Sequence, residues 1–412
     1  MKDLIDGLCL YDMNRGTVTT LTGTENGRIK AVGELAAFAK KFNLGGNIWR
    51  KYLAYLIATD ENAFSLSCER KTSSDDKLNK LALYDCEQLF RLWHYDLKTV
   101  YPGSLVSLLD FDNTCDASYH GEAGEKISYL ADNLDNAKNE RDFLNAIKDY
   151  YEKFGVGEFG LYRAFRLVSK SGSTNIELQY ITNTERKKLT DLVGYESQKK
   201  QLLDNTLAFL DGKSANNVLL YGDGGTGKSS SVKALLNEYS DRGLRIIEVY
   251  KHQFTSISEL ISKIKDRNYR FIIYLDDLSF EEFETEYKYF KAIIEGGIEC
   301  RPSNVLIYAT SNRRHLIKET FADRNDMRVG SDEVHRSDTL AEKLSLVARF
   351  GLTILFTSPN QDEYLIIVRA LAKRAGIVMD DIELCTRALQ WQMRGSGKSG
   401  RTAQQFIDSL NN

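Results

Sequence analysis

The ten residues YGDGGTGKSS, at positions 221–230, constrain the fold more than any other stretch of the chain. They fit the pattern G-x-x-x-x-G-K-[ST] through Gly222, Gly227, Lys228 and Ser229. The apolar run NVLL comes before them, and VKALLNEY, with helical spacing, comes after. A glycine-rich loop between a strand and a helix can point backbone N–H groups at phosphate oxygens, and the helix N-terminus adds a favourable dipole. This context predicts a phosphate-binding loop rather than an ordinary glycine-rich turn.

Phosphate binding gives particular side chains of this loop a role. Lys228 would reach the outer phosphates, and the hydroxyl of Ser229 would join the coordination shell of Mg2+. The predicted nucleotide contacts in the loop are Gly222, Asp223, Gly224, Gly225, Thr226, Gly227, Lys228, Ser229 and Ser230. A second stretch, GSGKSG at 395–400, has Gln392 where the first loop glycine should stand, and no strand precedes it. We therefore expect no second phosphate loop there.

Magnesium in such a site also needs a carboxylate at the end of a neighbouring strand. The stretch FIIYLDD supplies Asp276 and Asp277 directly after an apolar run. Asp276 would hold Mg2+, usually through water, and Asp277 would orient or polarise the attacking water. Paired acids at a strand end can also be ordinary solvated residues. Because they follow a phosphate loop in a series of strands and helices, we predict that both belong to the site.

Another buried run, NVLIYATSN, ends in the polar residues Thr310, Ser311 and Asn312. The amide of Asn312 has the chemistry to hydrogen-bond a γ-phosphate or the attacking water. A polar turn at the end of a strand is the alternative. Both interpretations fit these residues taken alone.

The order of apolar runs predicts three parts. Residues 1–185 are mainly helical and rich in aromatics, with a β-hairpin expected near 165–182, so we expect an α+β domain for partner recognition or self-association. In residues 186–358, short β-branched runs alternate with helical stretches, which predicts a parallel α/β sheet. Residues 359–412 contain only helical patterns and predict a helical lid. The aromatic helices of the first part fit a packed core better than a stacking platform for bases.

Composition limits the class of protein further. The 412 residues are 42% hydrophobic and 27% charged, which is typical of a folded globular protein of two or three domains. The formal net charge of −3 gives no general reason to expect nucleic-acid binding, although it does not exclude a local basic patch. Six cysteines are scattered singly, no stretch has the roughly 20 apolar residues that span a bilayer, and the N-terminus does not look like a signal peptide. We therefore expect a cytoplasmic protein.

Taken together, the region from about residue 191 onward resembles the AAA+ ATPases, with several motifs in the correct order. DLVGY (191–195), which includes Val193 and Gly194, is similar to the segment that surrounds adenine. Asn312 matches the sensor-1 position. The resemblance implies an AAA+ P-loop fold with ATP and Mg2+ bound at the loop.

Two arginines also match AAA+ positions. In AEKLSLVARFG, Arg349 matches the arginine finger, which a neighbouring subunit inserts beside the γ-phosphate. In GKSGRTAQQF, Arg401 matches the sensor-2 position of the lid. Either arginine taken alone also fits a solvated surface charge. The resemblance therefore implies a homo-oligomer, a ring or open spiral of six subunits by family analogy.

Four stretches, DLVGYESQKKQLL, YLDDLSFEE, IYATSNRRHL and EKLSLVARFG, together resemble an uncharacterised bacterial branch of AAA+ ATPases known as a domain of unknown function. The run from ARFG to LAKRAGI is similar to the same region of bacterial replication initiators. The resemblance implies an ATPase fold and site and brings no biological role with it.

One departure bears on activity. AAA+ proteins usually have Glu after the magnesium-binding Asp, and Asp277 stands there in this chain. Aspartate reaches roughly 1.5 Å less far, and misplacement on that scale can cost on the order of 100-fold in rate. Glu281 and Glu282 are candidates to compensate, and they are equally well explained as the acidic first turn of a helix.

Three functions therefore stay open at this point. The first is an ATPase that hydrolyses ATP in a ring and remodels an unknown protein or nucleic-acid partner. The second is an ATP-dependent oligomerisation switch with slow or no hydrolysis. The third is a DNA-associated loader, which the initiator resemblance suggests, but the negative net charge and the lack of a recognisable DNA-binding motif count against it.

Overall fold

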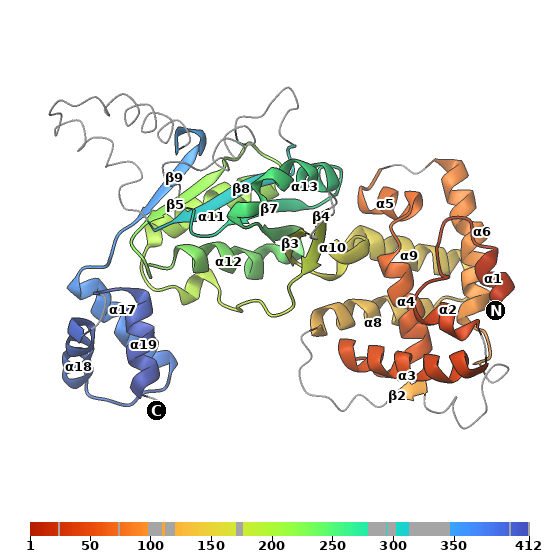
Figure 1. Ribbon diagram of the computed structural model, residues 1–412, viewed down its shortest axis with the longest axis horizontal. Coiled ribbons are helices and arrows are strands. Elements are labelled where there is room, and N and C mark those ends of the chain that lie inside the picture. Colours follow the sequence, from red (N-terminus) through yellow and green to blue (C-terminus); the bar gives the residue numbers. More distant parts are fainter. Residues whose placement is uncertain are drawn as a thin grey trace. The chain divides into compact units, whose positions relative to one another are not determined.

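The structure is a computed structural model with two compact units (Figure 1). It describes residues 1–23, 25–72, 75–97, 109–111, 120–169, 176–278, 294, 302–312, 347–394 and 397–410. The first unit consists of Met1–Arg163 and Tyr180–Asn183, and the second of Ala164–Gln179 and Thr184–Asn412. Glu281 and Glu282, the candidates to compensate for Asp277, lie outside the described residues.

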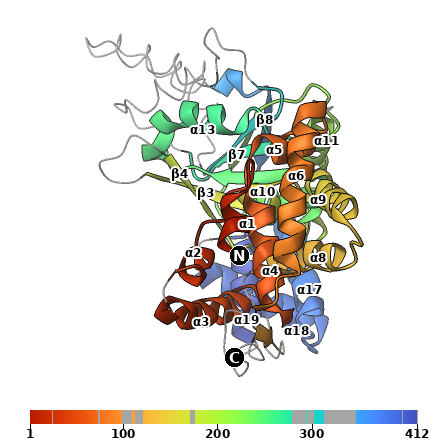
Figure 2. The ribbon, with the colours of Figure 1, turned by 90° about the vertical axis from the view of Figure 1, so that its right-hand side faces the viewer.

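The first unit is built mainly from helices, which carry the red to yellow colours in Figure 2. They are α1 (Lys2–Asp6), α2 (Thr17–Leu21), α3 (Glu25–Phe42), α4 (Ile48–Thr59), α5 (Ala63–Glu69), α6 (Asp76–Trp93), α8 (Gly121–Asp135), α9 (Glu140–Phe154) and α10 (Gly157–Leu161). Two short antiparallel strands, β1 (Gly46–Asn47) and β2 (Asp110–Phe111), accompany them.

The aromatic residues of these helices form the interior of the first unit. Trp49 of α4, Trp93 of α6 and Tyr150 of α9 are almost completely buried. The buried carboxylate of Asp85 on α6 accepts hydrogen bonds from the backbone N–H groups of residues 9–11 at 2.7–3.1 Å, which fixes the N-terminal segment on α6. These rings therefore serve as core, as we expected from their helical spacing.

The second unit contains a seven-stranded sheet and the helices around it. The strands are β3 (Ala164–Ser169), β4 (Ile176–Tyr180), β5 (Val218–Gly222), β6 (Leu244–Glu248), β7 (Arg270–Leu275), β8 (Val305–Ser311) and β9 (Leu352–Phe356). The helices packed around the sheet are α11 (Glu196–Leu210), α12 (Lys228–Tyr239) and α13 (Ile257–Ile264). Short 3-10 helices span Leu189–Asp191, Ser240–Arg242 and Lys251–Ser256.

The strand order, β4-β3-β6-β7-β8-β5-β9, puts the phosphate-loop strand β5 between β8 and β9. From β3 to β9, every neighbouring pair runs parallel. All seven residues of β8 are buried, as expected for a parallel strand covered on both faces. Because the strands are parallel, the ends of β5, β7 and β8 meet at one edge of the sheet.

The hairpin that we expected in the N-terminal domain belongs to this sheet instead. Strand β3 pairs in parallel with β6, with Ala164 opposite Ile246 and Arg166 opposite Glu248, and β4 lies on the outer side of β3. The residue pattern predicts both strands, but a period of two does not identify the sheet that a strand joins. The second unit therefore begins at Ala164, before the expected boundary at 185.

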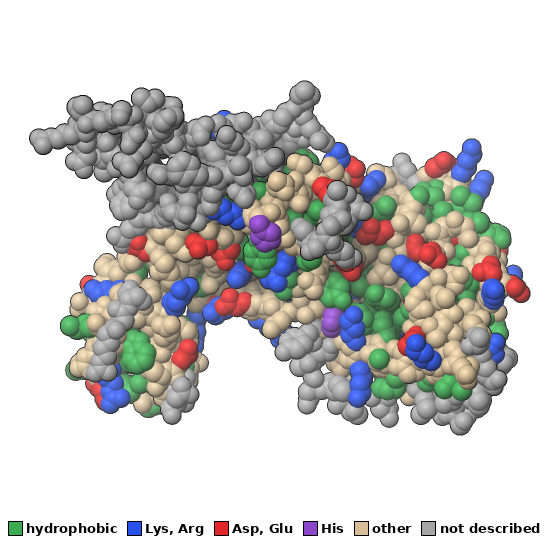
Figure 3. Space-filling model, viewed as in Figure 1, with side chains coloured by type: hydrophobic (Ala, Val, Ile, Leu, Met, Phe, Trp, Pro, Cys, Tyr) green, Lys and Arg blue, Asp and Glu red, His purple; other side chains and the backbone are tan. Residues whose placement is uncertain are grey.

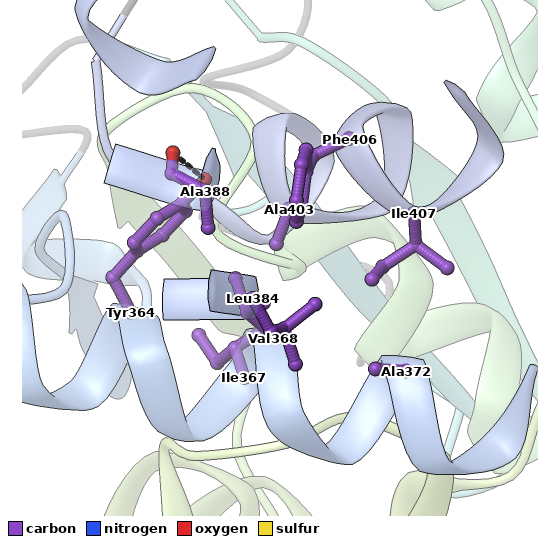
Figure 4. Packing of buried hydrophobic residues seen from close by; sticks show 9 residues of the cluster. All are labelled: Tyr364, Ile367, Val368, Ala372, Leu384, Ala388, Ala403, Phe406 and Ile407. Carbon is purple, nitrogen blue, oxygen red and sulfur yellow. Dashed lines mark hydrogen bonds between the residues drawn. The ribbon is translucent and has the colours of Figure 1, made fainter. Parts of the chain in front are cut away.

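The chain ends in a helical subdomain of α17 (Gln361–Arg374), α18 (Asp381–Arg394) and α19 (Gly400–Leu410). Their facing sides form the apolar cluster of Figure 4, which contains Tyr364, Ile367, Val368, Ala372, Leu384, Ala388, Ala403, Phe406 and Ile407. Asn360 caps α17, since its side chain accepts from the N–H of Glu363 at 2.9 Å and the Glu363 carboxylate accepts in return.

Acidic and basic side chains are interspersed on the face shown in Figure 3, in keeping with the small net charge. Within the described ranges, no helix combines the length and the apolar character that crossing a bilayer requires.

Candidate nucleotide-binding site

The loop between β5 and α12 requires glycine at two positions for steric reasons. At Gly222 (φ +127°), a Cβ atom would lie 2.0 Å from the carbonyl oxygen of Phe356 on β9. At Gly225 (φ +75°), a Cβ atom would lie 2.9 Å from the hydroxyl oxygen of Ser399. Both backbones are in conformations that L side chains rarely adopt. Gly227 (φ +93°) is the N-cap of α12, so the loop leads directly into the N-terminus of a helix, as a phosphate site requires.

Lys228 begins α12 and is only 4% exposed. Its Nζ donates to the carbonyl oxygens of Gly222 at 3.2 Å and Asp223 at 2.6 Å, so the ammonium group lies inside the curve of the loop. Burial lowers the pKa of this ammonium group, although nearby aspartates favour its charged form. Thr226 supports the loop, since its hydroxyl donates to the carbonyl oxygen of Asp223 at 2.9 Å.

The carboxylate of Asp276, just after β7, is the centre of a hydroxyl network. Its Oδ1 accepts from the hydroxyls of Ser229 on α12 at 2.7 Å, Tyr274 on β7 at 2.7 Å and Thr310 on β8 at 2.6 Å. Partial desolvation raises the pKa of Asp276, but the three hydrogen bonds outweigh it and hold the pKa below its ordinary value. The carboxylate is therefore charged at neutral pH.

Asp277 has a different environment. Its backbone lies in the left-handed region, at φ +53°, and its N–H donates to Thr310 Oγ1 at 3.0 Å. Its carboxylate oxygen Oδ1 accepts from the side-chain amide of Asn312, which follows β8, at 2.8 Å. The structure thus brings Asp277 and Asn312 together at the same edge of the sheet as Asp276.

The segment 193–195 connects the sheet with the helical subdomain. Val193 packs against the apolar cluster of α17–α19, and Gly194 adopts a positive φ of 83°. Tyr195 donates from its hydroxyl to the carbonyl oxygen of Thr357 at 2.8 Å, and its ring lies 5.1 Å from that of Phe356. Desolvation raises the pKa of Tyr195 to about 12, so this phenol keeps its proton.

The N-terminus of α19 contacts the phosphate loop. The backbone N–H of Arg401 donates to the carbonyl oxygen of Gly225 at 3.3 Å, and the Arg401 charge is near enough to lower the pKa of Lys228. Arg401 therefore lies beside the loop, and its charge acts on the ammonium group of Lys228. The stretch 395–400, which we did not expect to form a phosphate loop, supplies Ser399 beside Gly225.

Arg349 lies at the other end of the sheet from the loop of its own chain. It precedes β9, whose first residue, Leu352, pairs with Val218, whereas Phe356 pairs with Gly222 at the loop end. Five residues of strand span about 15 Å. The structure therefore does not bring Arg349 to the phosphate loop of the same chain.

Three residues outside our expected site take part in it. Tyr274 and Thr310 bind the Asp276 carboxylate, and Ser358 binds the carboxylate of Asp223 at 2.6 Å. Tyr274 could have been found from the sequence, because a residue two positions before Asp276 on a strand shares its face. No local sequence pattern indicates the role of Ser358, because it lies 135 positions from Asp223.

The side-chain oxygen atoms of Ser229 and Asp276 are suitable ligands for Mg2+. Mg2+ prefers oxygen ligands, typically one or two from protein together with water and phosphate oxygens. The hydroxyl of Ser229 and the charged Oδ1 of Asp276 lie 2.7 Å apart next to the loop. Ser229 and Asp276 are therefore the residues that would hold the ion.

The loop, the carboxylates at the end of β7 and the strand order place the second unit in the AAA+ class of P-loop nucleotide-binding folds, as the sequence predicted. Residues 161–412 match the family described as "Protein of unknown function (DUF815)", and the chain belongs to this family.

Other similarities are more limited. A stretch of 78 residues is 40% identical to the replication factor C large subunit of Staphylothermus marinus, and it covers 19% of this chain and 18% of that protein. The chain thus spans less than a fifth of that relative. Among solved structures, the Thermotoga maritima RuvB Holliday junction branch migration motor aligns with a TM-score of 0.33 and 16% identity, over 55% of this chain and 72% of RuvB.

Proposed function

We propose that this protein binds ATP with Mg2+ at residues 222–229, hydrolyses ATP in a ring of identical subunits, and uses turnover to remodel a protein or nucleic-acid partner. The observation that carries the proposal is the 2.7 Å contact between Ser229 and Asp276 beside the buried ammonium group of Lys228. A hydroxyl, a carboxylate and a lysine around a glycine loop are the groups that Mg2+ and a triphosphate require.

Each group would act on a different part of the nucleotide. The backbone N–H groups of the loop would bind the phosphates, and Lys228 would exchange its two carbonyl contacts for phosphate oxygens. Val193 and Gly194 would lie beside the adenine. When bound, Mg2+ would neutralise charge on the phosphates.

Hydrolysis also needs an oriented water. Asp277 would orient it, because its carboxylate follows the end of β7, one residue after Asp276. Its contact with Asn312 supports a role for the amide in orienting the carboxylate as well as the γ-phosphate or water. Arg401 would contact the γ-phosphate from the helical subdomain of the same chain.

The position of Arg349 supports a ring. Because it lies a strand length from its own loop, it would act as an arginine finger only in the site of a neighbouring subunit. By analogy with the AAA+ class, we propose six subunits. The proposal also places the protein in the cytoplasm, where ATP is plentiful and buried free thiols such as Cys68 and Cys86 stay reduced.

Steady-state ATP hydrolysis across a series of protein concentrations tests this function, with Lys228→Ala and Asp277→Asn beside the wild type. We expect specific activity to rise with protein concentration and to be lost in both variants, while Asp277→Asn still binds ATP. A wild-type protein that binds no ATP in the presence of Mg2+ would contradict the proposal at its first step.

One observation favours a second candidate, an oligomerisation switch with slow or no hydrolysis. Asp277 is shorter than the usual glutamate, and its carboxylate is already hydrogen-bonded to Asn312. In that case ATP would drive assembly, measured by light scattering, and no phosphate would be released by the wild type or either variant.

A further inference from the structure

Asp223 is an acidic residue in a loop that we propose binds polyphosphate. Its Oδ2 accepts two hydrogen bonds from Ser358, one from the backbone N–H and one from the hydroxyl, both at 2.6 Å. The backbone N–H of Asp223 donates to the carbonyl oxygen of Phe356 at 2.9 Å. The side chain is therefore directed at the segment that follows β9.

That segment, residues 357–360, joins the sheet to the helical subdomain, and we call it the hinge segment. It is bound at both ends. Tyr195 donates to the carbonyl oxygen of Thr357 at 2.8 Å, and Asn360 caps α17. Asp223 is thus the residue through which the phosphate loop holds the hinge segment.

The helical subdomain has a second contact with the loop, at Arg401 and Gly225. Helices α17 and α19 share one apolar cluster, so the position of α19 depends on where α17 begins. A hinge segment fixed on the loop would consequently fix Arg401 over the phosphate site.

Because the carboxylate of Asp223 is charged, the direction in which it points affects phosphate binding. A free carboxylate beside phosphates would repel them, because like charges a few ångströms apart interact strongly near a protein surface. Two donors from Ser358 hold the carboxylate and partly offset its charge.

We propose that Asp223 is a positioning residue: bound by Ser358, its carboxylate fixes the hinge segment on the phosphate loop and keeps negative charge away from the phosphates. The second part of this statement rests on the proposed function, whereas the first part does not.

Hydrogen exchange of the Ser358 amide in the full chain, without nucleotide, tests the first part. In Asp223→Asn the amide loses its charged acceptor, and we expect it to exchange about tenfold faster. Asp362→Asn, at an exposed position on the first turn of α17, is the matched control and should leave the rate unchanged. An unchanged rate in Asp223→Asn would overturn the contact, whether or not the protein binds ATP.

ATP affinity in a double-mutant cycle tests the second part. Ser358→Ala removes the hydroxyl donor and keeps the backbone N–H, so the carboxylate is held by one hydrogen bond instead of two, and ATP binding should weaken by about threefold to tenfold. Asp223→Asn in the Ser358→Ala background should restore the affinity, because the less firmly held charge is then absent. If Asp223→Asn has the same effect in both backgrounds, Ser358 does not hold the charge aside and the proposal is overturned. If the wild type binds no ATP but the Ser358 amide still depends on Asp223, the proposed function fails while the hinge contact stands.

Discussion

The two ends of the parallel sheet differ in which groups of the proposed nucleotide site a single chain places there. At the carboxyl end, the phosphate loop and the ends of β7 and β8 are joined by hydrogen bonds through Ser229 and Thr310. At the amino end, Arg349 precedes β9, a strand length away. A single chain thus brings together the groups that we propose for nucleotide and metal, but its proposed arginine finger cannot reach them. Binding and turnover should therefore be separable by mutation.

At the carboxyl end of the sheet, the neighbouring residues Asp276 and Asp277 also differ, in how firmly each side chain is held. Asp276 is held by three hydroxyl donors, which keeps its pKa below the ordinary value. Asp277, the next residue, has a left-handed backbone and a side chain bound by one amide, that of Asn312. We infer that Asp276 is held in a fixed position, whereas Asp277 would exchange its contact with Asn312 for one with water.

The largest expected effect separates the two ends of the sheet. Arg349→Ala should lower ATP turnover by about 1,000-fold or more while ATP binding is retained, as for other arginine fingers. Mixing it with Lys228→Ala should restore part of the activity, since the second variant supplies Arg349 to intact loops. Arg369→Ala, which removes an exposed ion pair with Asp381, is the control. Mixtures that stay inactive would argue against a shared site.

The next effect separates the two aspartates. Asp276→Asn should weaken Mg2+-dependent nucleotide binding by about 10- to 100-fold, because loss of an outer-shell partner costs that much in metal affinity. Asp277→Asn should leave that binding unchanged and abolish turnover. Calorimetric titration with ADP, with and without Mg2+, checks the difference. Equal losses of binding in the two variants would remove the distinction between the aspartates.

A smaller effect concerns Thr310, whose hydroxyl donates to Asp276 and accepts from the N–H of Asp277. Thr310→Val keeps the shape but loses both bonds, so we expect turnover to fall about tenfold. Thr310→Ser retains the hydroxyl and should stay close to the wild type. Similar turnover in the two variants would mean that the aspartates are positioned independently of β8.

The smallest effect is on stability. At φ +53°, Asp and Asn are tolerated better than longer side chains, so Asp277→Glu should lower the free energy of unfolding by about 1 kcal/mol and Asp277→Asn should change it little. Urea titration measures both. If Asp277→Glu is as stable as the wild type, backbone conformation does not explain why aspartate stands where AAA+ proteins usually have glutamate.

Much of the fold follows from local sequence patterns. The run VLL before the loop and the helical spacing after Lys228 predict β5 and α12, and the apolar runs that end in Asp276 and Asn312 predict β7 and β8. Parallel pairing then brings the ends of these strands to one edge. The loop glycines are also predictable, because their spacing reflects conformations that the structure requires.

What the sequence could not predict depends on contacts between distant residues. The pairing of β3 with β6 joins residues about 80 positions apart, and a strand pattern carries no information on its partner. The contact of Asp223 with Ser358 also joins distant residues, which lie 135 positions apart. The contact of Asn312 with Asp277 was missed because the strand end predicted a phosphate or water contact and gave no sign of the neighbouring carboxylate.

The extension of the sheet by β3 and β4 also decides where the protein can be divided. A fragment that starts at 186 would lack both strands and leave the backbone N–H and C=O groups of β6 unpaired at an exposed edge of the sheet, a known cause of aggregation. A fragment that starts at 161 would keep the edge covered. The match to the family begins at residue 161 and the second unit begins at Ala164, so the two boundaries lie close together.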